Sequence, residues 1–194
     1  MNPTRQTLIQ RLQAQPDERG WEEFAATYAG YLQAILRGMG LNHHDAEDLR
    51  QQVLLRIWKG LPNYHYEPGK HRFRSWLCTV ARNAARNHLV SPAARHGDEL
   101  PDDNPDPAPS ELESIFTREW EEHLAQLALA EVRQRFQPQV MECFQLFMDG
   151  LAAPEVAARM GISVNAAYVN RQRVQNALVK EVVRLDQEIG RVAN

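Results

Sequence analysis

The feature that most constrains the fold is a stretch from Ser91 to Ser110 that cannot contribute to a hydrophobic core. It reads SPAARHGDELPDDNPDPAPS and holds five prolines and a cluster of acids, with few apolar side chains to bury. Such a composition is typical of a linker or an extended segment. On either side of it, apolar residues recur with the period of a helix, and we find no strand-type alternation. The sequence therefore predicts an all-α protein of two small helical domains joined by an extended acidic linker.

The distribution of charge follows the same division. The net charge is −3, but residues 1–92 carry 12 basic and 8 acidic residues, residues 93–113 carry 1 and 7, and residues 114–194 carry 9 and 10. A basic domain beside an acidic linker is plausible for a protein that works within a nucleic-acid assembly, although one solvated basic helix face would give the same counts.

Three helices are predicted in the first domain. The apolar spacing indicates one from Trp21 to Leu41, and Asn42 or Asp45 can cap the next, because a short polar side chain accepts hydrogen bonds from the free N–H groups there. Pro62 stops that second helix. A third helix is predicted from about Phe73 to Leu89.

One face of the second helix is a candidate for contact with a partner. At 100° per residue, Asp48, Gln51, Gln52 and Leu55 share the face opposite the apolar stripe. A single exposed leucine usually has no function. Surrounded by hydrogen-bonding groups, Leu55 could instead anchor a partner helix, and both interpretations stay open at this point.

The second domain contains a helix-turn-helix pattern. Residues 115–136 form one helix or a broken pair, and the segment Gly150–Asn165 then predicts a short helix that ends at Gly161. Ser163 is expected to cap a long helix over about residues 164–188. A helix, a turn with glycine and a longer helix is the arrangement in which the second helix enters the major groove of DNA.

The outward face of this long helix carries amide and guanidinium groups. Amides can read base edges, and arginines can bind phosphates or guanine. A charged, solvent-facing side of a bundle helix is the plainer interpretation, but the preceding short helix and glycine turn favour DNA contact. The candidate contacts are Asn165, Tyr168, Arg171, Gln172, Arg173 and Asn176.

Several segments, in order along the chain, resemble the extracytoplasmic-function (ECF) type of sigma factor in the sigma-70 family. DAEDLRQQVLLRIW (Asp45–Trp58) resembles the polymerase-binding helix of sigma region 2, and FRSWLCTVARNAARNHL (Phe73–Leu89) resembles its promoter-melting helix. The helix-turn-helix with NAAYVNRQRV (Asn165–Val174) resembles region 4. The resemblance implies region 2 over residues 1–91, a linker over 92–113 and region 4 over 114–194. It also implies a transcription initiation factor that directs core RNA polymerase to promoters.

The resemblance assigns partners and contacts to matching positions. The clamp helices of the polymerase's largest subunit would contact Asp48, Gln51, Gln52 and Leu55, and region 4 would contact the flap of the second-largest subunit. Aromatic rings would stack on unstacked bases of the −10 element, at about 1–3 kcal/mol per base, while cations hold phosphates. These −10 candidates are Tyr64, His65, Tyr66, Lys70, Arg72, Phe73, Arg74, Arg82, Asn83 and Arg86. The helix-turn-helix would read the −35 element, and an anti-sigma protein is a further partner that the resemblance allows.

Other classes of function have little support in the sequence. The seven histidines lack zinc-ligand spacing, and no glycine-rich phosphate loop is found, so we expect no enzyme activity, cofactor or metal. Cys78 and Cys143 are far apart, which suits a reducing cytoplasm. No apolar run approaches the roughly 18 residues of a membrane span, and the polar N-terminus does not resemble a signal peptide, so we expect a cytoplasmic protein without membrane contact.

Two alternatives to a sigma factor remain. One is a stand-alone helix-turn-helix regulator whose helical N-terminal domain dimerises or senses a signal, and which binds duplex DNA tightly by itself. The other is a helical scaffold with no role at DNA. A sigma factor, by contrast, should bind DNA weakly alone and co-purify with polymerase.

Overall fold

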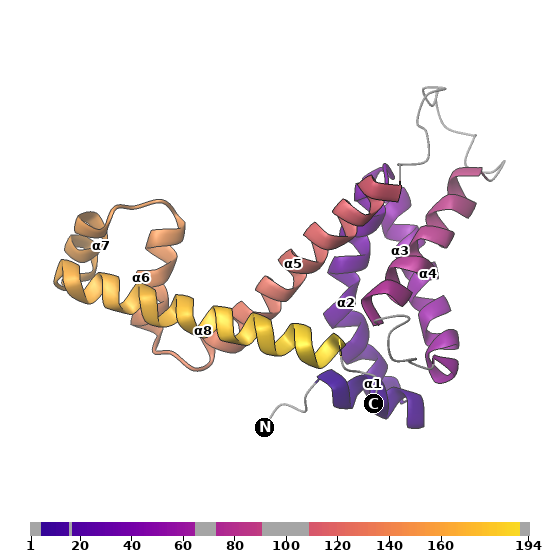
Figure 1. Ribbon diagram of the computed structural model, residues 1–194, viewed down its shortest axis with the longest axis horizontal. Helices are drawn as coiled ribbons and strands as arrows, with labels where there is room; N and C mark the ends of the chain where they lie inside the picture. The colour runs from indigo at the N-terminus through magenta and orange to yellow at the C-terminus, as the bar shows by residue number, and fades with distance from the viewer. Residues whose placement is uncertain (1–4, 16, 65–72, 91–108, 191–194) are drawn as a thin grey trace. The chain divides into compact units, whose positions relative to one another are not determined.

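The computed structural model describes residues 5–15, 17–64, 73–90 and 109–190, and its elements are helical throughout (Figure 1). In chain order they are α1 (Arg5–Ala14), α2 (Glu18–Gly38), α3 (His43–Gly60), the 3₁₀ turn η1 (Leu61–Asn63), α4 (Phe73–Val90), α5 (Pro109–Arg133), α6 (Pro138–Met148), α7 (Ala153–Met160) and α8 (Val164–Gly190). No strand occurs within these described ranges. The predicted all-α class is confirmed, while residues 91–108, which include most of the predicted linker, lie outside the described residues.

The chain divides into two compact units. Unit 1 comprises Met1–His123 together with Glu188–Asn194, and unit 2 comprises Leu124–Gln187. The boundary lies within α5, so the first half of this helix belongs to unit 1. The predicted domain limits of 1–91, 92–113 and 114–194 stay a prediction, but residues 109–113 of the predicted linker are helical.

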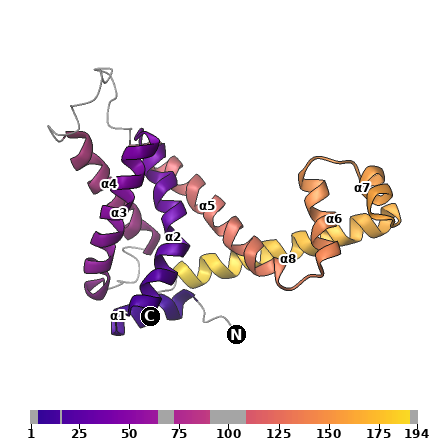
Figure 2. The ribbon, with the colours of Figure 1, turned by 180° about the vertical axis from the view of Figure 1, so that it is seen from behind.

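The core of unit 1 is built from the apolar faces of α2, α3 and α4, which lie side by side in Figures 1 and 2. These faces follow the predicted helical period. Burial of each large apolar side chain stabilises the fold by about 1.5–3 kcal/mol. The buried residues include Phe24, Tyr28, Leu32, Ile35 and Leu36 of α2, Leu49, Val53 and Ile57 of α3, and Leu77, Ala81 and Ala84 of α4.

Local signals in the sequence determine where the helices of unit 1 begin and end. The Asp17 side chain accepts a hydrogen bond from the backbone N–H of Gly20 at 2.7 Å at the start of α2. At the start of α3, the Asn42 side chain accepts from the N–H of Asp45 at 2.9 Å, so Asn42 is the cap of the two candidates. Pro62 lies in η1, directly after the end of α3, as predicted.

The first half of α5 packs against α2 in unit 1. Its residues Leu112, Phe116 and Trp120, spaced four apart, are all buried. A Cβ atom on Gly38 of α2 would lie only 2.6 Å from Cγ2 of Ile115, so the two helices approach closely where α2 has no side chain. The helix begins at Pro109, earlier than the sequence analysis expected, because proline is well suited to the first turn of a helix.

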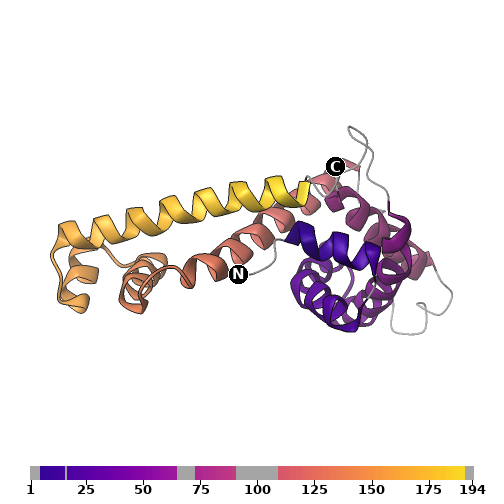
Figure 3. The ribbon, with the colours of Figure 1, turned by 90° about the horizontal axis from the view of Figure 1, so that it is seen from below.

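Unit 2 contains the predicted helix-turn-helix, formed by α7, a turn and the start of α8. Gly161 ends α7 with a φ of +65°, a left-handed conformation that favours glycine. The Ser163 side chain accepts a hydrogen bond from the N–H of Ala166 at 3.1 Å and caps α8 as predicted. Figure 3 shows α8 as one unbroken helix. The supporting core is Cys143, Leu146, Val156, Ala157 and Ala167.

A buried carboxylate joins α8 to the turn that follows α5. Glu181 is 2% exposed, and it forms ion pairs with Arg184 and, at 2.9 Å, with Arg135. Burial alone would raise the pKa of Glu181. The hydrogen bond and charge of Arg184, together with Arg135, outweigh burial and leave this pKa below its ordinary value.

Candidate polymerase and nucleic-acid interfaces

The outward face of α3 exposes the residues predicted to bind polymerase. Asp48, Gln51 and Gln52 are exposed, and the side chain of Leu55 is 53% exposed among them. The opposite face of α3 supplies the buried core residues, so the predicted separation of the two faces is confirmed. Leu55 is therefore an apolar side chain held at the surface by a rigid helix, the geometry needed for an anchor in a protein interface.

A shallow apolar depression lies beside Leu55. It has a volume of about 390 Å³ and is lined by Trp21, Gln51, Leu54, Leu55 and Trp58. The rings of Trp21 and Trp58 meet edge-on, with centroids 4.9 Å apart. Sequence reasoning placed Trp21 on the apolar side of its helix and did not identify it as part of this surface. The signal available was Trp58, one turn after Leu54 and Leu55 on α3.

The outward face of α4 carries three of the residues predicted to contact the −10 element. Arg82, Asn83 and Arg86 are all exposed on this helix. The apolar side of α4 packs on the core of unit 1, so these polar groups share the solvent side of a fixed helix. They form a compact group of two guanidinium groups and one amide, suited to phosphate and base contacts.

Two aromatic residues predicted to stack on bases are buried instead. Phe73 is 1% exposed and Tyr64 is 8% exposed. The Phe73 ring meets those of Phe24 and Tyr28 edge-on, and the Tyr64 ring lies 4.8 Å from that of Trp76. Both rings are packed among other aromatic side chains of unit 1, and the stacking role of Tyr64 and Phe73 on bases stays a prediction.

Of the five remaining −10 candidates, one contacts α5 and four lie outside the described residues. The Arg74 guanidinium contacts the Glu113 carboxylate at 3.2 Å and donates to the Thr117 hydroxyl at 2.8 Å. It is therefore already paired with α5, which the sequence did not indicate. The structure does not describe His65, Tyr66, Lys70 and Arg72, so their predicted roles stay predictions.

The outward face of α8 exposes all six residues predicted to contact the −35 element. Gln172 donates to the side chain of Asn176 at 2.9 Å, which aligns two amides along the helix. Arg171 lies over the ring of Phe147, 5.1 Å from its centroid, and Tyr168 stacks on the same ring at 6.3 Å. These contacts orient the cation and the ring at the edges of an amide-bearing surface. The exposed set is Asn165, Tyr168, Arg171, Gln172, Arg173 and Asn176.

Neither a metal site nor a membrane-spanning helix occurs in the part of the chain that the structure describes. Within it, no three His, Cys, Asp or Glu side chains gather in a way that could hold a metal ion. No helix in these ranges combines the length and apolar character needed to cross a membrane. Cys78 and Cys143 are both buried and unbridged, and burial raises the pKa of each thiol.

The sequence is similar to known proteins along most of its length. Residues 24–95 match the family described as Sigma-70 region 2. The ECF RNA polymerase sigma factor SigF of Caulobacter vibrioides is 30% identical over 179 residues, which cover 88% of this chain and 89% of that protein. The RNA polymerase sigma factor CarQ of Myxococcus xanthus is 29% identical over 178 residues, or 88% of this chain and 94% of that protein. The ECF sigma factor SigE of Mycolicibacterium smegmatis is 26% identical over 82% of this chain, but the match spans only 62% of SigE.

Proposed function

The chain belongs to the ECF RNA polymerase sigma factors, and from this premise we propose that it binds core RNA polymerase and directs it to promoters. It recognises and melts the −10 element through unit 1 and binds the −35 element through unit 2. It acts in the cytoplasm and has no catalytic activity of its own. The similarity to a sigma factor along 89% of that protein's length carries this proposal. A stand-alone regulator is not favoured, because relatives aligned across both units are named as sigma factors.

The face of α3 is the proposed contact with the polymerase's largest subunit. Asp48, Gln51 and Gln52 offer hydrogen bonds to polar side chains of the clamp helices. Leu55, 53% exposed, supplies the apolar anchor. Anchors of this kind carry much of the binding free energy of an interface, about 2 kcal/mol or more each, because they lose all contact with water on binding.

Substitution of this face tests the polymerase contact. The double variant Gln51→Ala/Leu55→Asp should stay folded, since both side chains are exposed, and should bind core polymerase at least about 30-fold more weakly. Val90→Asp is the matched control, because Val90 is another exposed apolar residue of unit 1, 64% exposed at the end of α4. Affinity is measured with labelled protein and purified core enzyme. Equal affinities of the two variants would contradict the proposed contact.

The faces of α4 and α8 are the proposed contacts with promoter DNA. Arg82 and Arg86 hold phosphates beside the −10 element, and Asn83 contacts an unpaired base. On α8, the amides of Gln172 and Asn176 read base edges of the −35 element. Asn83→Ala should therefore keep full affinity for core polymerase and slow promoter opening, followed with a fluorescent base analogue in the −10 element. Normal opening by this variant would remove Asn83 from the proposal.

Reconstituted transcription tests the function as a whole. The purified protein, mixed with core polymerase and fragments of the genomic DNA, should produce transcripts that start at discrete promoters. Core polymerase without the protein is the control. The proposal fails if no fragment yields a promoter-dependent transcript. Tight, sequence-specific binding to duplex DNA by the protein alone, as a dimer, would instead support a stand-alone regulator.

A further inference from the structure

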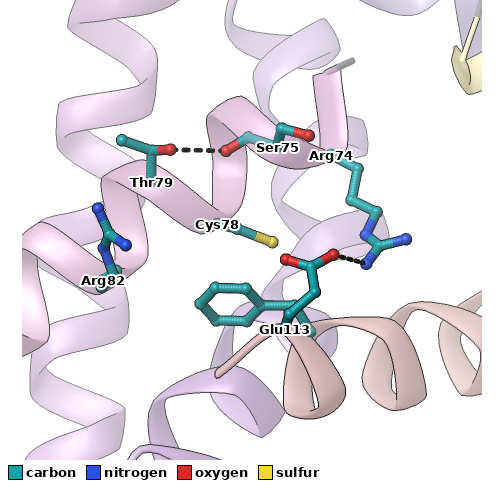
Figure 4. Close-up of a pocket in the computed structure, with 7 residues that line it drawn as sticks. Arg74, Ser75, Cys78, Thr79, Arg82 and Glu113 are labelled. Atoms are coloured by element: carbon teal, nitrogen blue, oxygen red, sulfur yellow. Dashed lines mark hydrogen bonds and ion pairs between the residues drawn. The ribbon is translucent and has the colours of Figure 1, made fainter. Parts of the chain in front are cut away.

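A small polar pocket lies between α4 and the first half of α5 in unit 1. Its volume is about 150 Å³, enough for a small anionic group (Figure 4). Two guanidinium groups border it, and Ser75 and Thr79 add hydroxyl groups along the same side of α4. Its lining residues are Arg74, Ser75, Cys78, Thr79, Arg82, Glu113 and Phe116.

One carboxylate from α5 lies against Arg74 in this pocket. Glu113 contacts the Arg74 guanidinium at 3.2 Å, and Figure 4 shows the two side chains pointing toward each other. The Arg74 side chain is 23% exposed, whereas that of Glu113 is 73% exposed. The arginine is thus largely fixed by the fold, while the carboxylate is free to rotate into solvent.

We propose that Glu113 binds Arg74 in the place of a DNA backbone phosphate, and that promoter DNA displaces it. This inference rests on the proposed function of unit 1. A guanidinium binds carboxylate and phosphate oxygens with the same planar arrangement of donors, so one anion can replace the other. Arg82 of the same pocket is exposed and belongs to the proposed DNA-binding face, so a strand that crosses α4 passes this pocket.

The exchange does not require α5 to leave unit 1. The helix is held by Leu112, Phe116 and Trp120, which are buried, and by the close approach of Ile115 to Gly38. Rotation of the Glu113 side chain alone opens the guanidinium to a phosphate. Glu113 therefore acts as a competitor that lowers the affinity of the free protein for DNA without blocking the site.

The size of the effect follows from the exposure of the pair. Exposed ion pairs stabilise a fold only weakly, and loss of this competitor corresponds to a gain of about two- to fivefold in affinity for DNA. A new contact between Arg74 and a phosphate also releases a counterion. Wild type and Glu113→Gln both form this contact, because DNA displaces Glu113 in the wild type, so the dependence of log K on log salt should be alike in the two. Arg74→Gln, which lacks the contact, should make this dependence shallower by about 0.7 for single-stranded DNA.

The test compares two charge-matched variants of the full chain. Glu113→Gln removes the carboxylate and keeps its shape. Glu122→Gln makes the same change of net charge at another exposed position of α5 in unit 1. Binding of a short mixed-sequence single-stranded oligonucleotide is measured by fluorescence anisotropy over a range of salt. E113Q should bind about two- to fivefold more tightly than wild type with a similar salt dependence, and E122Q should stay near wild type.

A second background shows whether the effect passes through Arg74. In an Arg74→Gln protein, E113Q should bring no further gain in affinity. The inference is overturned if E113Q and E122Q behave alike, or if the gain from E113Q persists without Arg74. The same wild-type preparation is also tested for promoter-dependent transcription with core polymerase. Transcription without an effect of E113Q on DNA binding overturns only this inference. Absence of transcription overturns the proposed function.

Discussion

The buried carboxylate of Glu181 should be a main source of stability in unit 2 and should contribute nothing to the stability of unit 1. It lies between Arg135 and Arg184, and its side chain is 2% exposed, against 52% and 40% for the two arginines. Glu181→Gln preserves the size of the side chain and removes its charge. Both arginines then lose an ionic hydrogen-bond acceptor, but each is exposed enough to turn toward water.

The expected cost of this substitution lies between two limits. Hydrogen bonds to charged groups contribute about 1.5–3 kcal/mol. Removal of one partner from a fully buried pair costs about 3–5 kcal/mol, which is an upper bound here because the arginines reach solvent. We expect the free energy of unfolding of unit 2 to fall by about 2 kcal/mol. For a small domain this change lowers the urea midpoint by about 1–2 M.

The four tryptophans allow the two units to be followed separately. All of them, Trp21, Trp58, Trp76 and Trp120, lie in unit 1, so tryptophan fluorescence reports on that unit. Far-UV circular dichroism reports on the helices of both. The part of the urea transition that circular dichroism reports and tryptophan fluorescence does not is the unfolding of unit 2. Glu181→Gln should shift this part to lower urea. Glu142→Gln, an exposed carboxylate on α6 in unit 2, is the control and should leave both signals unchanged.

The pH dependence of the stability of unit 2 tests the same reasoning, because the direction of the change is fixed. The pKa of Glu181 lies below its ordinary value of 4.5: burial raises it, but the two arginines lower it by more. Its stabilisation is therefore complete above about pH 4.5 and is lost as the pH falls through the lowered pKa of the folded state. The difference in unfolding free energy between wild type and Glu181→Gln should therefore shrink as the pH falls below about 4.5. A difference that stays constant there, or a variant as stable at pH 7 as Glu142→Gln, would refute the argument.

Three further outcomes are expected. Gly161→Ala should destabilise unit 2 by about 1 kcal/mol or more, seen in the same dichroism transition, because its φ of +65° disfavours a side chain. Cys78 and Cys143 should react with a thiol reagent only as fast as the protein unfolds, since both are buried with raised pKa values, and a rapid native phase would contradict this. In the holoenzyme, Gln172→Ala should reduce discrimination at one base pair of the −35 element by about 1–3 kcal/mol, measured on a set of promoters altered one position at a time.

Local sequence was sufficient to predict the elements that depend on local physics. The period of apolar residues predicted α2, α3, α4 and the long α8. Single residues determined their ends, such as Asn42 and Gly161, because caps and left-handed turns are properties of a few adjacent residues. The exposure of Leu55 followed for the same reason: the angle between residues on one helix needs no knowledge of what packs around it.

Burial of Tyr64 could not be predicted in this way. Tyr64 stands beside a polar loop in the sequence, where an exposed ring that stacks on a base was a reasonable expectation. Phe73 shares the helical spacing of Leu77 and Ala81, which placed it on the apolar side of its helix, although the motif resemblance made it a base contact. The Phe73 ring contacts Phe24 and Tyr28 of α2, and the Tyr64 ring contacts Trp76 of α4, so the burial of each depends on residues far from it in the sequence or on another element. A motif resemblance identifies positions, but it does not say which rings of a cluster face solvent and which face one another.

Contacts between charged residues of different helices could not be predicted from the sequence either, as the pairing of Arg74 with Glu113 shows. By sequence, Arg74 belongs to a basic domain and Glu113 to the end of an acidic linker, and we counted the two charges in separate segments. In the structure, Glu113 lies in the first turns of α5, and the packing of that helix on unit 1 brings its carboxylate to the basic side of α4. The acidic residues after the linker therefore do more than offset the net charge. One of them competes for a cation of the proposed DNA-binding face, so the affinity of this face for DNA depends on charge within its own chain as well as on the phosphates it meets.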